Sequence, residues 1–145
     1  MGMFDAIDIS ASGLTAERLR MDVTAENLAN AQSTRTPEGG PYRRKVVVLQ
    51  QAETGFAGEL AGVMGANSAP AGVEAAGIVA DANPLRRVYD PGHPDADANG
   101  YVQMPNVNPV SEMVDLIDAS RAYQANVTAM QTTKTAFSKT IELLR

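Results

Sequence analysis

The residues best suited to chemistry lie in the short acidic stretch 95–100, which reads DADANG. Oxygen-bearing side chains at alternate positions, followed by a glycine, match the first half of a calcium-binding EF-hand loop. The second half does not match, because Asn106 occupies the twelfth position, where the loop needs a bidentate glutamate. A solvated turn is therefore the expected structure. The alternative function is a calcium-dependent binding module that uses Asp95, Asp97 and Asn99.

No other group of residues suggests catalysis. His93 is the only histidine and the chain has no cysteine, which leaves neither a thiolate metal site nor a cysteine nucleophile. His93 with a neighbouring aspartate is a weak metal site without a second histidine, so we expect a solvated loop histidine. No glycine-rich stretch has the lysine and helix that a phosphate-binding loop needs. The sequence predicts a protein that is not an enzyme, with no catalytic residue, metal site or cofactor.

The charge of the chain argues against nucleic acid as a partner. The net charge is −5 and the isoelectric point is about 4.8, so phosphate backbones would repel the protein. The basic run Arg43-Arg44-Lys45 is short, and we expect it to be the solvated start of a strand. No window approaches the ~18 apolar residues of a membrane span. Charges also interrupt the region where a cleaved secretory signal needs an apolar core, which is compatible with export without one.

The elements that position these residues begin with a predicted helix from Phe4 to Ala31. It contains no proline, and its apolar residues form two rows on opposite faces. The first row has heptad spacing and comprises Ile7, Ala11, Leu14, Met21, Ala25 and Leu28. The second row comprises Ile9, Ser12, Ala16, Leu19 and Val23. A helix on one small core needs a single apolar face, so two faces predict a helix inside a bundle.

A second long helix is predicted from Pro109 to Arg145. Proline suits a first helical position, and neither glycine nor proline follows it. Its heptad seam comprises Met113, Leu116, Ser120, Tyr123, Val127, Met130, Lys134, Phe137, Ile141 and Leu144. Beside the seam runs a row of small residues, which lets another backbone come close. Lys134 is the only charge between positions 122 and 138, which predicts burial over much of the circumference.

Short strands are predicted between the two helices. β-branched runs and turn residues favour strands at Tyr42–Gln50, Gly72–Ala80, Leu85–Asp90 and Gly100–Met104. The intervening stretch 51–71 is rich in glycine and alanine and reads as an irregular loop.

The predicted fold class is α+β, with long terminal helices and a small β-rich middle domain. Residues 1–33 and 109–145 would form a coiled-coil-like helical domain, and residues 34–108 the middle domain. Both helices attach to the same middle domain, so they run antiparallel if they pair. One pair cannot cover both apolar faces of the first helix, so we expect helices from other chains to cover the rest.

Three stretches together resemble the bacterial flagellar rod, hook and hook-associated axial proteins. They are ENLAN at 26–30 with STRTPEGGPYRR at 33–44, GYVQMPNVNPV at 100–110, and SRAYQANV at 120–127 with its continuation to 143. The TRTPEGGPYRR stretch and the short length resemble the proximal rod proteins of this family. The resemblance covers both helices and their junctions, whereas residues 51–99 carry little signal.

The resemblance implies a structural subunit of the rod, which crosses the periplasm, transmits motor torque and is required for motility. The subunit would leave the cytoplasm through the flagellar type III export channel, without a cleaved signal peptide. Its partners would be the rod proteins FlgB, FlgF and FlgG, copies of itself, and the base of the rod at the MS ring. The terminal helices would form the inner layer that lines the channel, and the middle domain the outer layer.

We expect the assembly interface to combine the apolar helix rows with asparagines at the helix junctions. The helix residues are Ile7, Leu14, Leu19, Met21, Val23, Leu28, Met113, Leu116, Tyr123, Asn126, Val127, Met130, Phe137, Ile141 and Leu144. The junction residues are Asn27, Asn30, Asn106 and Asn108. Two roles are open for the junction amides: they bond turns and backbone groups of neighbouring subunits, or they cap helix ends within one chain.

Overall fold

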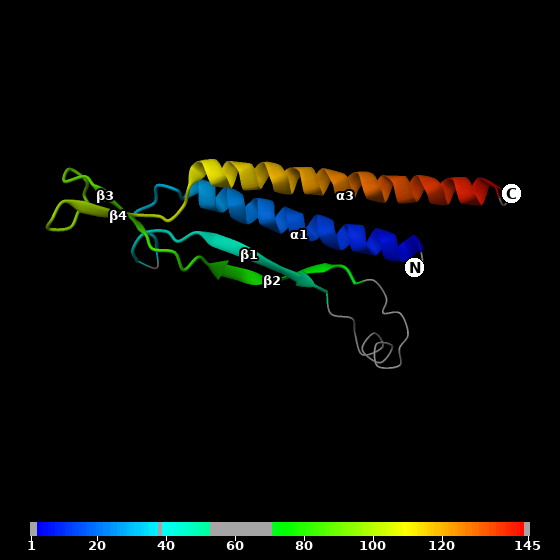
Figure 1. Cartoon of the computed structure of the whole chain (residues 1–145), viewed down its shortest axis with the longest axis horizontal. Coiled ribbons are helices and arrows are strands. Elements are labelled where there is room, and N and C mark those ends of the chain that lie inside the picture. The colour runs from blue at the N-terminus through cyan, green and yellow to red at the C-terminus, as the bar shows by residue number, and fades with distance from the viewer. Residues whose placement is uncertain (1–2, 38, 53–70, 144–145) are drawn as a thin grey trace, which may run out of the picture.

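The computed structural model describes residues 3–37, 39–52 and 71–143 and is elongated (Figure 1). In chain order the elements are α1 (Met3–Ala29), β1 (Lys45–Gln51), β2 (Val73–Ala80), β3 (Arg86–Tyr89), β4 (Tyr101–Met104) and α3 (Pro109–Leu143). All six predicted helices and strands are confirmed, with boundaries that move by a few residues. The predicted irregular loop 51–71 lies outside the described residues except at its two ends.

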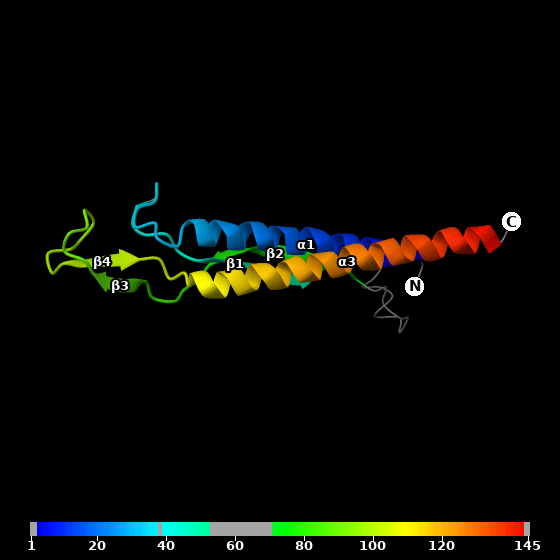
Figure 2. The same cartoon turned by 90° about the horizontal axis from the view of Figure 1, so that it is seen from above.

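The two long helices lie side by side and run antiparallel, as predicted (Figures 1 and 2). α3 begins at Pro109, where the missing N–H costs no intrahelical hydrogen bond. Asn108 caps this end, because its Oδ1 accepts a hydrogen bond from the Val110 N–H at 3.1 Å. α1 is 27 residues long and α3 is 35, so α3 extends beyond the start of α1 (Figure 1).

Small residues let the two helices approach closely, as the row of small side chains predicts. Ala119 of α3 is 0% exposed. On α1, a Cβ added to Gly13 would lie 3.0 Å from Nδ2 of Asn126, so the asparagine amide rests directly on the glycine. Towards the far end, the rings of Phe4 and Phe137 meet edge to face with centroids 6.0 Å apart. The two helices therefore stay in contact along most of α1.

The hairpin of β1 and β2 lies along the side of α1, and its backbone is not close to that of α3 (Figure 1). The strands pair antiparallel from Lys45 opposite Ala80 to Gln51 opposite Val73. Ser12 of α1 attaches the start of β2: its Oγ accepts a hydrogen bond from the Val73 N–H at 3.0 Å. The same hydroxyl donates to the carbonyl of Ile9 at 2.8 Å, which holds it in position.

This hairpin corrects one prediction about α1. We expected helices from other chains to cover its second apolar face, but β1 and β2 of the same chain contact α1 beside α3. Two buried residues of the second row, Ala16 and Val23, are 4% and 5% exposed within the single chain. This cover by the same chain was not predicted, because strand residues carry no helical periodicity that would mark them as partners of a helix. Cover of the remaining partly exposed residues of the row, Ile9, Ser12 and Leu19, by other chains stays a prediction.

The hairpin of β3 and β4 lies beyond the junction of the helices (Figure 1). Its register runs from Arg86 opposite Met104 to Tyr89 opposite Tyr101, and these two tyrosine rings pack edge to face at 5.3 Å. Val102 is 2% exposed. The packed terminal helices with small hairpins between them confirm the α+β class, whereas the division at 1–33, 34–108 and 109–145 stays a prediction.

Candidate assembly interface

Asn27, near the end of α1, is the centre of a polar cluster that joins both helices to the first hairpin. Its side chain is 1% exposed, and its amide forms the full set of hydrogen bonds that an asparagine can make. Nδ2 donates to the Lys45 carbonyl at 2.8 Å and to Glu112 Oε2 at 3.0 Å. Oδ1 accepts from the Lys45 N–H and the Tyr42 hydroxyl, both at 2.9 Å. One side chain thus connects the start of β1, the preceding loop and α3 to α1.

Glu112, in the first turn of α3, carries the negative charge of this cluster and is 1% exposed. Its Oε1 accepts a hydrogen bond from Arg44 Nε at 2.5 Å. The Arg44 guanidinium also lies 3.1 Å from Asp115 and 3.8 Å from Asp81. The hydrogen bond to Glu112 raises the pKa of Arg44 above its ordinary value, and the three surrounding carboxylate charges add to this effect. A buried carboxylate is tolerated here because it is paired and hydrogen-bonded.

The structure corrects our prediction that Arg43-Arg44-Lys45 is solvated throughout. The side chain of Arg44 is only 26% exposed, and its three carboxylate partners come from two different parts of the chain. Lys45 forms an ion pair with Glu26 at 2.6 Å, while Arg43 is exposed. The sequence pattern gave no sign of this convergence, because positions 81, 112 and 115 are distant from position 44.

The remaining junction asparagines also bond within the chain. Asn30 Nδ2 donates to the Glu26 carbonyl at 3.0 Å, which ties it to the last turn of α1. Asn106 Oδ1 accepts from the Arg44 N–H at 2.8 Å, and its Nδ2 donates to the Asn83 carbonyl at 3.2 Å. Together with the helix cap at the start of α3, these bonds correspond to the within-chain role that we left open.

The acidic stretch 95–100 is used to hold two loops together. Asp95 accepts hydrogen bonds from the Thr34 hydroxyl at 2.9 Å and from the Arg35 guanidinium. The bond from Thr34, with the charge of Arg35, lowers the pKa of the Asp95 carboxyl. Asp97 Oδ1 accepts two backbone N–H bonds at 2.9 Å within its own turn, which lower the pKa of Asp97.

These contacts give the calcium-binding alternative no support. Within the described part of the chain, no group of three or more His, Cys, Asp or Glu is arranged to hold a metal ion. The Asp95 carboxylate is already paired with the Arg35 cation. The Asp97 carboxylate closes an Asx turn, because it accepts from backbone N–H groups of its own turn.

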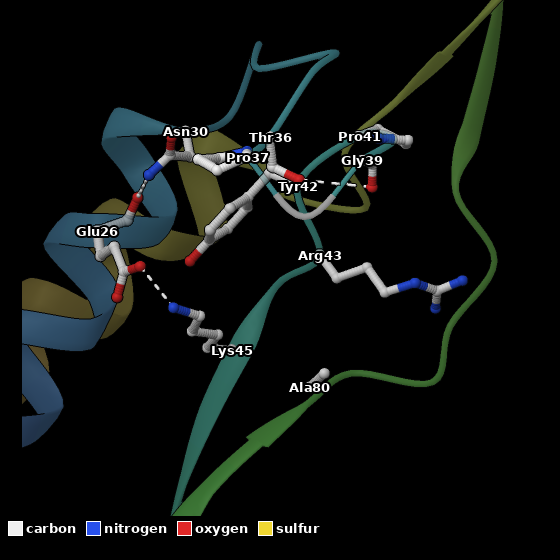
Figure 3. Close-up of a pocket in the computed structure, with 10 residues that line it drawn as sticks. All are labelled: Glu26, Asn30, Thr36, Pro37, Gly39, Pro41, Tyr42, Arg43, Lys45 and Ala80. Carbon is white, nitrogen blue, oxygen red and sulfur yellow. Dashed lines mark hydrogen bonds and ion pairs between the residues drawn. The ribbon is translucent and has the colours of Figure 1, made fainter.

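A hollow of about 450 Å³ opens between the end of α1 and the loop before β1 (Figure 3). It is lined by Glu26, Asn30, Thr36, Pro37, Gly39, Pro41, Tyr42, Arg43, Lys45 and Ala80. Figure 3 shows the Lys45–Glu26 ion pair on one side of it and the Arg43 side chain pointing away from α1. Burial, with the charge of Glu26, raises the pKa of the Tyr42 phenol, whose hydroxyl bonds Asn27. Among the described residues that line the hollow, Tyr42 is thus not an activated nucleophile.

The outward side of α3 changes character along its length. Near its start, four large apolar side chains are at least half exposed, and we call them the α3 stripe: Val110 at 70%, Met113 at 54%, Val114 at 53% and Ile117 at 50%. At 100° per residue the stripe lies about 160° around the helix from Glu112 and Ala119, which face α1. After Arg121 the same side carries uncharged polar residues up to Lys139.

Hydroxyl groups dominate the second half of α3, and each bonds its own helix. Hydroxyls of six residues donate to the carbonyl four positions earlier at 2.9 to 3.1 Å: Thr128, Thr132, Thr133, Thr135, Ser138 and Thr140. All but Thr133 are exposed. This part of α3 is not buried within one chain, so the predicted burial of its circumference stays a prediction about assembly.

The β1–β2 hairpin turns a second apolar surface outward. Val47 and Leu49 are partly covered, whereas the alternating Val46 and Val48 are 37% and 44% exposed and point away from α1. Val79, opposite Val46, is 55% exposed on the same side. We call Val46, Val48, Gly77 and Val79 the hairpin face.

The residues predicted for assembly divide into three groups by exposure. Val23 and Asn27 are buried within the chain. Partly exposed are Ile7, Leu14, Leu19, Met21, Leu28, Asn30, Asn106, Leu116, Tyr123, Asn126, Val127 and Met130. Exposed are Asn108, Met113, Phe137 and Ile141. Leu144 lies outside the described residues. The heptad reading missed the other members of the α3 stripe and the whole hairpin face, although the unbroken run VVVL at 46–49 puts apolar side chains on both faces of a strand.

Comparison with known proteins agrees with this architecture. Residues 7–35 match the model for the flagella basal body rod protein, and residues 98–143 match the model for the flagellar basal body rod FlgEFG protein C-terminal region. The flagellar basal-body rod protein FlgC of Bacillus subtilis is 47% identical over 148 residues, with 99% of both chains covered. The FlgC proteins of Borreliella burgdorferi and Salmonella typhimurium are 43% and 44% identical, with 98% or more of each chain covered.

The chain belongs to the FlgC family of flagellar basal-body rod proteins.

FlgC-family membership confirms the predicted resemblance and the predicted absence of enzymatic activity, because this family is structural. The chain is a structural subunit of the flagellar basal-body rod and assembles with other rod proteins. The matched regions contain most of α1 and all of α3, with Asn27 and Glu112 of the polar cluster, whereas Tyr42, Arg44 and Lys45 lie between them. Among the described residues, no helix combines the length and apolar character needed to cross a membrane.

Proposed function

We propose that this FlgC-family chain builds the proximal rod, transmits motor torque and contributes to the wall of the export channel. Its proposed partners are FlgB, FlgF and FlgG, copies of itself, and the base of the rod at the MS ring. We further propose that it reaches the rod in the periplasmic space through the flagellar type III export channel, without a cleaved signal. The helical domain would form the inner layer and the middle domain the outer layer.

The observation that carries this proposal is the cross-linked junction of α1, α3 and the first hairpin. A subunit that transmits torque needs elements that do not rotate independently. The Asn27 amide and the Arg44 guanidinium together bond residues from both helices and from the start of β1. Charge-assisted and buried bonds of this kind resist a change of angle more than apolar contacts, which are non-directional.

Exposed apolar residues on the helices supply the surface for assembly. Met113 and Ile141 are 54% and 52% exposed in the single chain, and Phe137 is 38% exposed. Covering a large apolar side chain contributes about 1.5–3 kcal/mol, which favours neighbours on these faces. We therefore propose Met113, Phe137 and Ile141 as residues that face neighbouring subunits. Val23 and Asn27 would act indirectly, by fixing the shape of the subunit.

Motility and rod assembly test the proposal. Deletion of residues 113–145 should abolish both, and cells that swim normally with this deletion would refute it. A finer variant, Met113→Asp, places a charge on an exposed surface and should leave the fold intact while it blocks rod assembly.

The matched control is Ala98→Asp, which adds the same charge at an exposed turn position outside the helices. We expect the control to swim normally. Circular dichroism of both purified variants should match the unchanged protein, so that a loss of assembly reports a lost contact and not unfolding. Equal motility of Met113→Asp and the control would exclude Met113 from the interface.

A further inference from the structure

α3, which carries the α3 stripe, and the hairpin of β1 and β2, which carries the hairpin face, lie on different sides of α1 (Figure 1). α3 and the hairpin each pack against α1, whereas their backbones do not lie close to each other. Neither apolar surface is therefore covered by the other within one chain. Large unpartnered apolar patches on a small protein mark interaction sites.

The two surfaces have matching sizes and complementary shapes. The α3 stripe extends over the eight residues 110–117, a rise of about 10 Å at 1.5 Å per residue. The valines of the hairpin face cover about 7 Å along β1 and the ~5 Å between two strands. Gly77, opposite Val48, leaves a notch among these valines, because nothing lies within 4 Å of a Cβ added there. A convex row of helix side chains such as Ile117 fits a flat strand surface with one notch.

Charges beside the two surfaces also complement each other. Asp118 follows the α3 stripe directly and is exposed, and Arg43 lies two residues before β1 and is exposed. Neither side chain has an ion-pair partner among the described residues. Contact of the stripe with the hairpin face can bring this carboxylate and this guanidinium together. Contact between two stripes would leave both Arg43 side chains without a partner.

We propose that the α3 stripe of one subunit docks on the hairpin face of a second copy of this chain. The contact uses two different surfaces, so each subunit keeps one free surface of each kind and the association continues head to tail. Such heterologous contacts generate helical assemblies when they do not close into a ring. The inference rests on the proposed function, since it supplies the contact between copies in the rod.

Disulfide trapping tests this contact, because the chain has no cysteine of its own. Ile117→Cys lies on the stripe and Val79→Cys on the hairpin face, and both positions are about half exposed. The two single variants are produced together in one cell, basal bodies are isolated and oxidised, and the chain is detected on a non-reducing gel. We expect a disulfide-linked dimer from the mixture and a ladder of longer oligomers from the double variant Ile117→Cys/Val79→Cys.

Three controls make the result specific. Thr128→Cys lies on the same side of α3 but beyond the stripe, so its mixture with Val79→Cys should give no dimer. Gly77→Val fills the notch and should reduce the dimer yield from the original mixture. Arg43→Glu should reduce that yield too, and Arg43→Glu combined with Asp118→Arg should restore it.

Several outcomes would overturn the proposal. A dimer from Ile117→Cys alone, as abundant as the dimer from the mixture, would show stripe-to-stripe pairing. A disulfide between Ile117→Cys and another rod protein carrying an introduced cysteine, with no dimer from the mixture, would show that a different subunit covers the stripe. In both cases the chain is still found in the basal bodies, so the proposed function stands. Absence of the chain from basal bodies of swimming cells would refute the proposed function and this contact together.

Discussion

Oε1 of Glu112 lies 2.5 Å from Nε of Arg44, although 68 positions separate the two residues in the chain. Glu112 is 1% exposed, so its charge depends on this partner and on Asn27 for stabilisation. The pair connects the first turn of α3 to the residue before β1. The angle between the helices and the hairpin therefore depends on a few charged and amide groups.

Replacement of Glu112 by alanine should lower the free energy of unfolding by about 3 kcal/mol or more, because it leaves Arg44 without its main partner and Asn27 with an unused donor. Glu112→Gln should also destabilise, since it removes the charge and puts an NH2 donor where one of the two carboxylate oxygens now accepts from Arg44 or Asn27. Urea unfolding followed by circular dichroism measures both. Glu142→Ala on the exposed side of α3 is the control and should change stability by less than about 0.5 kcal/mol.

Asn27→Asp should destabilise the chain although it is nearly the same size. The aspartate removes the Nδ2 donor and puts a second carboxylate beside Glu112 and opposite the Lys45 carbonyl. We expect a loss of at least about 2 kcal/mol, from an unmet buried hydrogen bond and like-charge repulsion. Asn99→Asp, the same substitution in the exposed turn, is the matched control. Equal melting temperatures for the two variants would show that Asn27 is not the centre of the junction.

Acid should weaken the contact between the loop that carries Thr34 and the 95–100 turn. Asp95 has a lowered pKa in the folded chain, because Thr34 and Arg35 stabilise its charged form. A lowered folded-state pKa means that the stabilisation is fully present above the unfolded value of about 3.9 and is lost as pH falls through the lower folded value. The melting temperature should therefore fall below about pH 4, and Asp95→Asn should reduce this dependence.

The control for this pH experiment is Asp22→Asn on the exposed side of α1, for which no ion pair is found among the described residues. It should retain the full acid dependence of the unchanged protein. An acid dependence that is identical in Asp95→Asn would mean that the loop contact contributes nothing to stability.

Gly72→Ala should detach the start of β2 from α1. A Cβ at this position would collide with Oγ of Ser12, which accepts the Val73 N–H bond. We expect a loss of about 1–3 kcal/mol, the usual cost of forcing an extra methyl group into a packed contact. Gly77→Ala, within β2, is the matched control, because its Cβ would meet nothing within 4 Å. Thermal unfolding should show the control to be neutral or slightly more stable.

Much of the fold could be predicted from the sequence, because its signals are local. Pro109 marks the start of α3, and the β-branched run at 46–48 marks β1. The close approach of the helices followed from their small residues, of which Ala119 is 0% exposed. The antiparallel pairing followed from two long helices joined to one short middle segment.

The candidate site was less predictable, because it depends on contacts between distant parts of the chain. Nothing around Arg44 indicates that Asp81, Glu112 and Asp115 will surround it. The packing of β1 and β2 on α1 was not predictable for a similar reason. Side chains of a strand alternate with a period of two residues, which does not match the 3.6-residue period of the helix that they cover. The resemblance of 26–44 and 100–110 to flagellar axial proteins located the junction without giving its chemistry.

The hydroxyls of α3 give the second half of this helix a one-way hydrogen-bonding capacity. Each hydroxyl proton of Thr128, Thr132 and Thr135 is already donated to a carbonyl of the same helix. What these side chains still offer outward is methyl groups and oxygen lone pairs. A neighbouring surface that packs against these hydroxyls must supply N–H or O–H donors to form hydrogen bonds with them. A surface that presents only acceptors finds no free donor on these three side chains. Chemical selectivity for the neighbour is thus built into α3 without a charged group.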